Sequence, residues 1–269
     1  MVIPEPWEWF HLGCLTITFI CIATLYKNRN KNGEAQLKSV LCTYGVIALL
    51  LEIIKQFVWS INYNFATNIA TWDYQWYAAP FQLCTTPIYA CLISACLKKD
   101  HPLRKSLLSY VAFVTISGSI ATILIPNNCF TSTLVVNIHT MWLHYGSFVV
   151  SIYLIMSGEV ELIGDNLRRA IVVFAVFVGI ATILNVGVYN SGILNSEVFN
   201  MFYISPYFIS ELPVFDAIQK SVPYGVFLMI YIVVLSIGAA LILGIAKGIR
   251  FMFSSEHDSV FRKSLHAKN

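Results

Sequence analysis

The sequence has few charged residues for its length. Only 12% of its 269 residues are Asp, Glu, Lys or Arg, whereas 57% are hydrophobic, and the mean hydropathy is +0.69. A water-soluble domain of this length needs more polar surface than this composition supplies. We therefore expect a single membrane domain over residues 1–269, without a soluble enzyme domain beside it and without an internal repeat.

Motifs for metals, nucleotides and nucleic acids are also missing. The seven cysteines show neither CxxC spacing nor a Cys/His pattern, which argues against a zinc site or a disulfide framework. The chain contains no glycine-rich phosphate loop and no nucleic-acid-binding motif. We expect no metal, no cofactor and no nucleic-acid partner, and the oligomeric state stays open.

Long apolar stretches dominate what remains. Each is long enough to cross about 30 Å of hydrocarbon as a helix. Their approximate limits are 8–26, 39–59, 79–97, 106–125, 137–157, 168–188 and 222–246. These stretches predict an all-α bundle of seven transmembrane helices.

Basic residues are distributed unequally between the connecting segments. Fifteen of the seventeen Lys and Arg residues lie after the first, third or seventh stretch or at the start of the sixth stretch. The segments at the other ends of the stretches contain Lys220 alone. This bias places the basic segments in the cytoplasm and the N-terminus outside. Glu5 and Glu8 precede the first stretch where a signal peptide has basic residues, so we expect a retained span. The expected location is a cell membrane of the bacterial plasma-membrane type.

The longest connection is the outer segment 189–221. It contains two prolines, several aromatic residues and three acidic residues. Connections of this length are commonly functional loops or lids. A helix and turn that lie on the surface and cover the bundle are the alternative.

Two opposite charges lie within the second stretch. Glu52 and Lys55 are three residues apart and therefore share one helix face, where a mutual ion pair would lower the cost of burying them. Such residues can belong to a functional site. Alternatively, the pair only locks helix packing, or Lys55 extends to the outer headgroups.

Further polar residues are expected in the same half of the bilayer. Cys84 should lie roughly 7 to 8 Å below the outer end of the third stretch, and His144 roughly 10 Å below the outer end of the fifth. The fifth stretch also contains His139. Others at similar depth are Gln82, Asn185 and Glu52. Their convergence predicts a site inside the bundle that opens toward the outer face.

A cysteine and a histidine at one depth can act as a nucleophile and its base. The imidazole of His144 can take the thiol proton of Cys84, and the thiolate can then attack an acyl carbon. The competing interpretation is that Cys84 is a small packing residue, as most cysteines inside membranes are.

Several segments resemble the YwaF-like family of integral membrane proteins, to which certain animal ether-phospholipid acyltransferases are related. They are LLEIIKQFVW, APFQLCTTPIY, LHYGS, the end of the sixth stretch at Asn185, FNMFYISPY and LPVFDAIQKSVPYGVFL. The resemblance implies a seven-helix bundle and acyl transfer through a membrane-embedded Cys/His pair. Cys84 and His144 are the matching positions.

The leading functional prediction is a lipid-remodelling enzyme that moves an acyl chain between a phospholipid and a lysophospholipid through a thioester on Cys84. Gln82 and Asn185 would donate to the oxyanion and Lys55 would meet a lipid phosphate. The alternative is a transporter or ligand-binding protein that uses Glu52, Lys55 and His144. A seven-helix receptor ranks lowest because the cytoplasmic connections are short.

Overall fold

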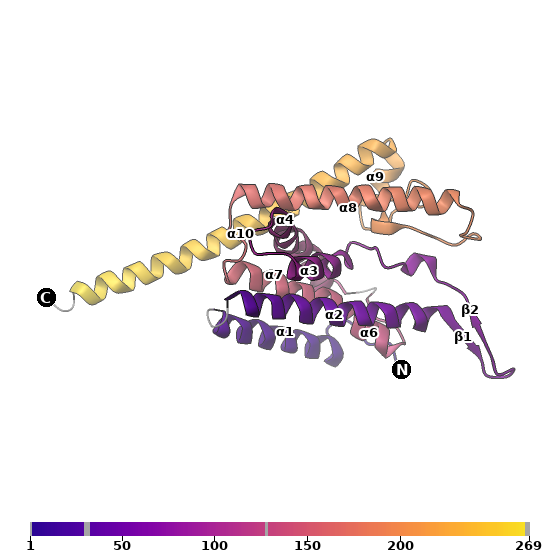
Figure 1. The fold of residues 1–269 in the computed structure, drawn as a ribbon, viewed down its shortest axis with the longest axis horizontal. Helices are drawn as coiled ribbons and strands as arrows, with labels where there is room; N and C mark the ends of the chain where they lie inside the picture. Colours follow the sequence, from indigo (N-terminus) through magenta and orange to yellow (C-terminus); the bar gives the residue numbers. More distant parts are fainter. Residues whose placement is uncertain (1, 30–32, 127–128, 267–269) are drawn as a thin grey trace.

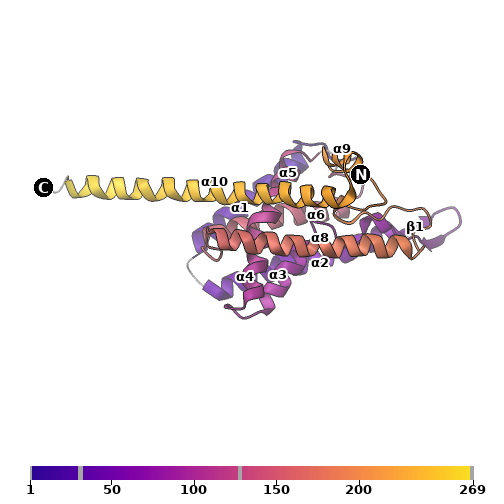
Figure 2. The same cartoon turned by 90° about the horizontal axis from the view of Figure 1, so that it is seen from above.

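The computed structural model describes residues 2–29, 33–126 and 129–266, with side chains up to Met252. These residues form a bundle of mostly parallel or antiparallel helices (Figures 1 and 2). Some basic residues behind the orientation prediction fall outside the described part, namely Lys31 and the side chains of Arg262, Lys263 and Lys268.

Six helical segments in the described residues are long and apolar enough to cross a membrane, so the chain is a multi-pass membrane protein. Two of them are interrupted by a π-helical turn. The six consist of α1 (Trp9–Asn28), α2 (Gly33–Ser60), α4 to α5 (Pro102–Tyr110, η2 Val111–Thr115, Ile116–Leu124), α6 to α7 (Leu134–Met141, η3 Trp142–Gly146, Ser147–Met156), α8 (Gly164–Asn190) and α10 (Tyr224–His266).

The third expected span differs from the prediction. Only Thr86–Cys96 is helical there, and this helix, α3, has 11 residues, which rise by about 16 Å and cannot cross the hydrocarbon alone. Proline lies in the first turn of α3, where its missing N–H and fixed φ favour the start of a helix. The expected count of seven spanning helices is therefore not confirmed.

The chain before α3 forms an exposed hairpin and an extended return. Strands β1 (Ile61–Asn64) and β2 (Ile69–Trp72) pair antiparallel, with Ile61 opposite Trp72. A short 3-10 helix, η1 (Trp76–Ala78), follows. Figure 1 shows the hairpin projecting beyond the end of α2, after which the chain turns back into the bundle.

The long segment between α8 and α10 folds against the bundle. It contains the 3-10 helix η4 (Met201–Tyr203) and the short helix α9 (Phe215–Ser221). Met201, Phe202 and Ile204 are fully buried. Phe202 has φ +59°, in the left-handed region, so tertiary contacts hold this turn in a strained conformation.

Small polar side chains join the two interrupted spans. Ser151 donates to the carbonyl of Val111 at 2.7 Å, and the hydroxyls of Ser119 and Ser147 are 2.8 Å apart. Inside lipid, the hydrophobic effect does not drive helices to associate, and close contacts and hydrogen bonds of this kind between helices take its place. The π-helical turns η2 and η3 therefore lie at or near a well-packed helix interface.

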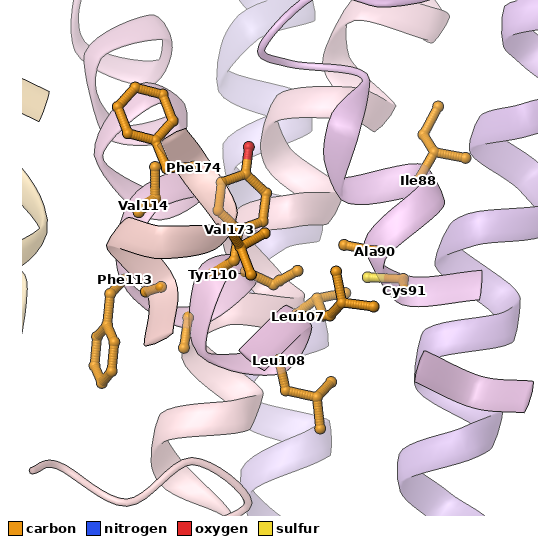
Figure 3. Packing of buried hydrophobic residues seen from close by; sticks show 14 of the residues in the cluster. Ile88, Ala90, Cys91, Leu107, Leu108, Tyr110, Phe113, Val114, Val173 and Phe174 are labelled. Carbon is orange, nitrogen blue, oxygen red and sulfur yellow. The ribbon is translucent and has the colours of Figure 1, made fainter. Parts of the chain in front are cut away.

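Apolar side chains fill the centre of the bundle and also cover its outside. Figure 3 shows the packed core, in which Tyr110 of α4 lies toward Phe174 of α8 and Leu107 of α4 lies near Cys91 of α3. The outer faces of α1, α8 and α10 expose large apolar residues to the surroundings. A protein that is apolar on both inside and outside matches a lipid environment.

The basic segments gather at one end of the bundle. Arg104, at the start of α4, pairs with Glu34, at the start of α2, and the start of α2 is opposite the hairpin (Figure 1). Helix α1 begins at the hairpin end, whereas α10 extends away at the other end. This arrangement agrees with the separation of basic and non-basic connections along the sequence.

Labelling from one side of the membrane tests this arrangement. We expect a membrane-impermeant maleimide to label Asn64→Cys on intact cells and to label Asp100→Cys only after permeabilisation, because both positions are exposed at opposite ends. The unsubstituted chain provides the background from its own cysteines. Labelling of both positions from the same side would contradict this topology.

Candidate functional site

A buried carboxylate, Glu52 of α2, organises the half of the bundle nearest the β1–β2 hairpin. Glu52 is 2% exposed. Its two oxygens are 2.6 Å from Lys55 Nζ and 2.6 Å from His139 Nε2, and it accepts a hydrogen bond of 2.8 Å from Gln56. A buried carboxylate with three donors avoids the free-energy cost of an unpaired charge.

Lys55 and Gln56 extend this cluster to the chain before α3. Lys55 Nζ donates to the carbonyl of Ala78 at 2.9 Å, and Gln56 Nε2 donates to the same oxygen at 2.7 Å. Lys55 is 6% exposed, so its ammonium points into the protein rather than to the outer headgroups. The cluster therefore fastens η1 to α2.

His139 of α6, for which the sequence alone predicts no role, contacts Glu52 directly. Its Nε2 lies 2.6 Å from Oε2 of Glu52, while its Nδ1 is buried and has no partner among the described residues. A buried carboxylate that is paired with one lysine still has free lone pairs, which need further hydrogen-bond donors. This need is the signal in the sequence that indicates a second cationic or N–H donor near Glu52. Depth alone did not separate His139 from His144.

Gln82 and Asn185 clamp the strained turn around η4. Gln82 accepts from the Phe202 N–H at 2.8 Å and donates to the Asn200 carbonyl at 3.1 Å. Asn185, which is fully buried, makes two hydrogen bonds with the backbone of Met201, at 2.7 and 3.0 Å. These paired amide contacts show that both side chains position the outer segment.

Cys84 lies in the non-helical stretch immediately before α3. It is half-buried and packs against the hydrophobic core. Lys55 and Glu52 lie within electrostatic range of its thiol. Cys84 follows, by six residues, the Ala78 carbonyl that Lys55 and Gln56 hold, and its membership of one site with Glu52 stays a prediction.

His144 lies on the π-helical turn η3 and is half-buried. It is within electrostatic range of His139. The described residues contain no hydrogen bond between its ring and Cys84. Tyr44 links the two regions, since its ring closely approaches Gly146 of η3 and its hydroxyl is within electrostatic range of Cys84.

A cavity of about 390 Å³ opens at the same end of the bundle. Gln82 and Tyr203 line it, together with three acidic residues, Asp73, Glu197 and Glu211. Burial, with smaller contributions from Cys84 and Glu211, raises the pKa of Tyr203 to about 12. Its phenol therefore stays a neutral hydrogen-bond donor at physiological pH.

Metal ligands do not cluster at this site. Within the described residues, no group of three or more His, Cys, Asp and Glu side chains could hold a metal ion.

Removing the central carboxylate should destabilise the protein. We expect Glu52→Gln to lower the free energy of unfolding by about 3 to 5 kcal/mol, because it leaves Lys55 buried without its counter-charge. Titration with sodium dodecyl sulfate in mixed micelles can measure this change. Asp216→Asn is the control, since Asp216 and Lys220 form an exposed pair at 4.0 Å, which contributes at most about 1 kcal/mol.

The comparison of these two variants distinguishes the contribution of a buried ion pair to stability from that of a surface ion pair. An equal, small loss in both would contradict the central role of Glu52. Replacing both Glu52 and Lys55 by leucine should recover part of the loss, because no buried charge then remains unpaired.

Comparison with known proteins gives one match. The model of the TMEM164 family matches residues 4–247. No curated protein and no solved structure matches the chain. The expected membership of the YwaF-like family is wrong, because the matching family is a different one, and the relation to ether-phospholipid acyltransferases that it implied has no support. Since the match spans nearly the whole sequence, the chain belongs to the TMEM164 family.

Proposed function

We propose that this membrane protein is a lipid-remodelling enzyme that transfers acyl chains between phospholipids and lysophospholipids through Cys84. One observation carries this proposal: a half-buried thiol lies two residues after Gln82, which lines a polar cavity, in a segment whose preceding turn is fastened to α2 by the buried ammonium group of Lys55. Lys55 would stabilise the thiolate as it forms. The apolar outside of the bundle would let lipids reach the site laterally.

His144 is the proposed base. A thiol among apolar neighbours is a weak nucleophile until a base removes its proton. His144 lies on a π-helical turn, a feature that is frequent at functional sites. Hydrogen bonds between catalytic groups are often long without substrate and tighten when it binds, so we expect His144 and Cys84 to approach each other around a bound lipid.

The proposed reaction has two balanced halves. His144 takes the thiol proton, the Cys84 sulfur attacks the ester carbonyl, and the leaving lysolipid oxygen receives that proton while the thioester forms. In the second half, His144 takes the proton of an acceptor hydroxyl, which attacks the thioester. The thiolate of Cys84 leaves and recovers the proton.

The geometry changes the roles expected for the supporting residues. The amide groups of Gln82 and Asn185 are engaged with the turn at residues 200–202. We therefore propose that they position the cavity wall rather than stabilise an oxyanion. The cavity of about 390 Å³ would hold a lipid headgroup, and the basic-residue bias would place it in the outer half of a cell membrane.

Acyl exchange by the purified protein tests the proposal. In liposomes that contain a phospholipid and an isotope-labelled lysophospholipid, we expect Cys84→Ala and His144→Ala each to lower the exchange rate about a hundredfold or more. Cys91→Ala is the matched control, because Cys91 lies on α3 as a fully buried packing residue. Mass spectrometry should find an acyl chain on the peptide that contains Cys84.

Thermal unfolding separates loss of chemistry from loss of folding. If Cys84→Ala unfolds at the wild-type temperature and also exchanges acyl chains at the wild-type rate, the cysteine mechanism is wrong. An acyl group found on Cys91 instead would contradict the assignment of the nucleophile.

The buried cluster of Glu52, Lys55 and His139 favours a second candidate, a proton-coupled transporter or ligand-binding protein. Ionisable groups inside a membrane bundle can mark a substrate or ion pathway or a proton relay. His139 takes the place expected for His144, since it contacts Glu52 directly. A solute-dependent proton flux in proteoliposomes that disappears with Glu52→Gln, while Cys84→Ala retains it, would support transport over acyl transfer.

A further inference from the structure

At the opposite end of the bundle, Arg104 is a buried cation with too few partners. It lies in the first turn of α4 and is 1% exposed. Its Nη2 donates to Glu34 at 2.8 Å. Its Nε and Nη1 are buried and, within the described part of the chain, have no hydrogen-bond partner.

Unsatisfied guanidinium donors are costly in a folded protein. A buried charged donor without a partner loses its hydration and gains nothing in return. Glu34 is about one-third exposed and occupies only one of the guanidinium nitrogens. An additional oxygen ligand would remove the remaining cost.

A cavity of about 480 Å³ lies beside Arg104. Lys99, Lys105 and Arg169 also line it, as do the first residues of α8. Helix α8 begins without a side-chain cap, because its N-cap residue is Ile163. The backbone N–H groups of its first turn are thus suited to bind a phosphate or carboxylate.

Acidic residues on the same wall restrict the charge of a ligand. Asp100, Glu159, Glu161 and Asp165 line the cavity. Asp165 is paired with Arg168 and Arg169 at 2.7 and 2.8 Å, whereas the other three oppose a highly charged anion. A phosphodiester has a single negative charge and is favoured over a phosphate monoester with two.

We propose that Arg104, the start of α8 and the lysines beside them bind the phosphodiester of a membrane phospholipid at the basic end of the bundle. Basic pockets between transmembrane helices on the cytoplasmic side are known sites for phospholipid headgroups. The basic-residue bias predicts that position for this cavity, since Arg104 contacts the start of α2, opposite the hairpin. The proposal does not depend on acyl transfer at Cys84.

Lipid titration of the purified protein in detergent tests the site. Native mass spectrometry and the thermal unfolding midpoint can report binding of dioleoylphosphatidylglycerol, with dioleoylglycerol as the lipid that lacks phosphate. We expect Arg104→Lys to bind the phospholipid about tenfold more weakly, because lysine keeps the charge but cannot reproduce the guanidinium donors. Arg168→Lys is the matched control, since Arg168 is 76% exposed in its side chain and forms no part of the cavity wall.

A second variant keeps the test decisive if Arg104→Lys folds poorly. Glu34→Gln removes the competing carboxylate and should bind the phospholipid several-fold more tightly. If both variants are less stable but bind the phospholipid with wild-type affinity, Arg104 and Glu34 form only a structural ion pair and the proposal is overturned. Inorganic phosphate that binds as tightly as the phospholipid and displaces it would overturn the assignment to a lipid.

Discussion

The half of this bundle nearest the β1–β2 hairpin depends on the burial of one carboxylate, Glu52. A carboxylate inside a membrane protein can remain ionised only if several donors replace its hydration. Lys55 and Gln56 come from the same helix, whereas His139 comes from α6. Lys55 and Gln56 also donate to the carbonyl of Ala78. The hydrogen bonds that Glu52 needs therefore join α2, α6 and the chain that leads into α3.

This connection explains how an irregular backbone can exist at membrane depth. The segment before α3 is not helical, so its polar groups need partners from elsewhere. Lys55 and Gln56 satisfy one carbonyl, and Gln82 exchanges hydrogen bonds with the turn at Asn200 and Phe202. Asn185 holds the other side of that turn. The polar residues that looked like separate site candidates form one support for a cavity wall and for the stretch that contains Cys84.

The long helices could be predicted from sequence because hydropathy reports burial in lipid directly. The third expected span was predicted wrongly, because residues 79–97 are mostly apolar although the backbone is helical only over Thr86–Cys96. Proline in the first turn of α3 favours a helix start there, and the residues immediately before Thr86 form turns instead of continuing the helix. The cluster around Glu52 was predictable as a charge pair three residues apart, whereas the contribution of His139 was not, because contacts between α2 and α6 depend on helix rotation.

A comparison of Glu52 with Arg104 shows how the partners of a buried charge distinguish a structural role from a ligand-binding role. Both are almost fully buried, near opposite ends of the bundle. Glu52 has donors on both oxygens, so its surroundings are complete without a ligand. Arg104 has one acceptor for a guanidinium with five N–H groups, and a cavity lies next to it. At Glu52, hydrogen bonds within the protein offset the free-energy cost of burying a charged group. At Arg104 that cost is only partly offset, and an external anion could supply the missing hydrogen-bond acceptors.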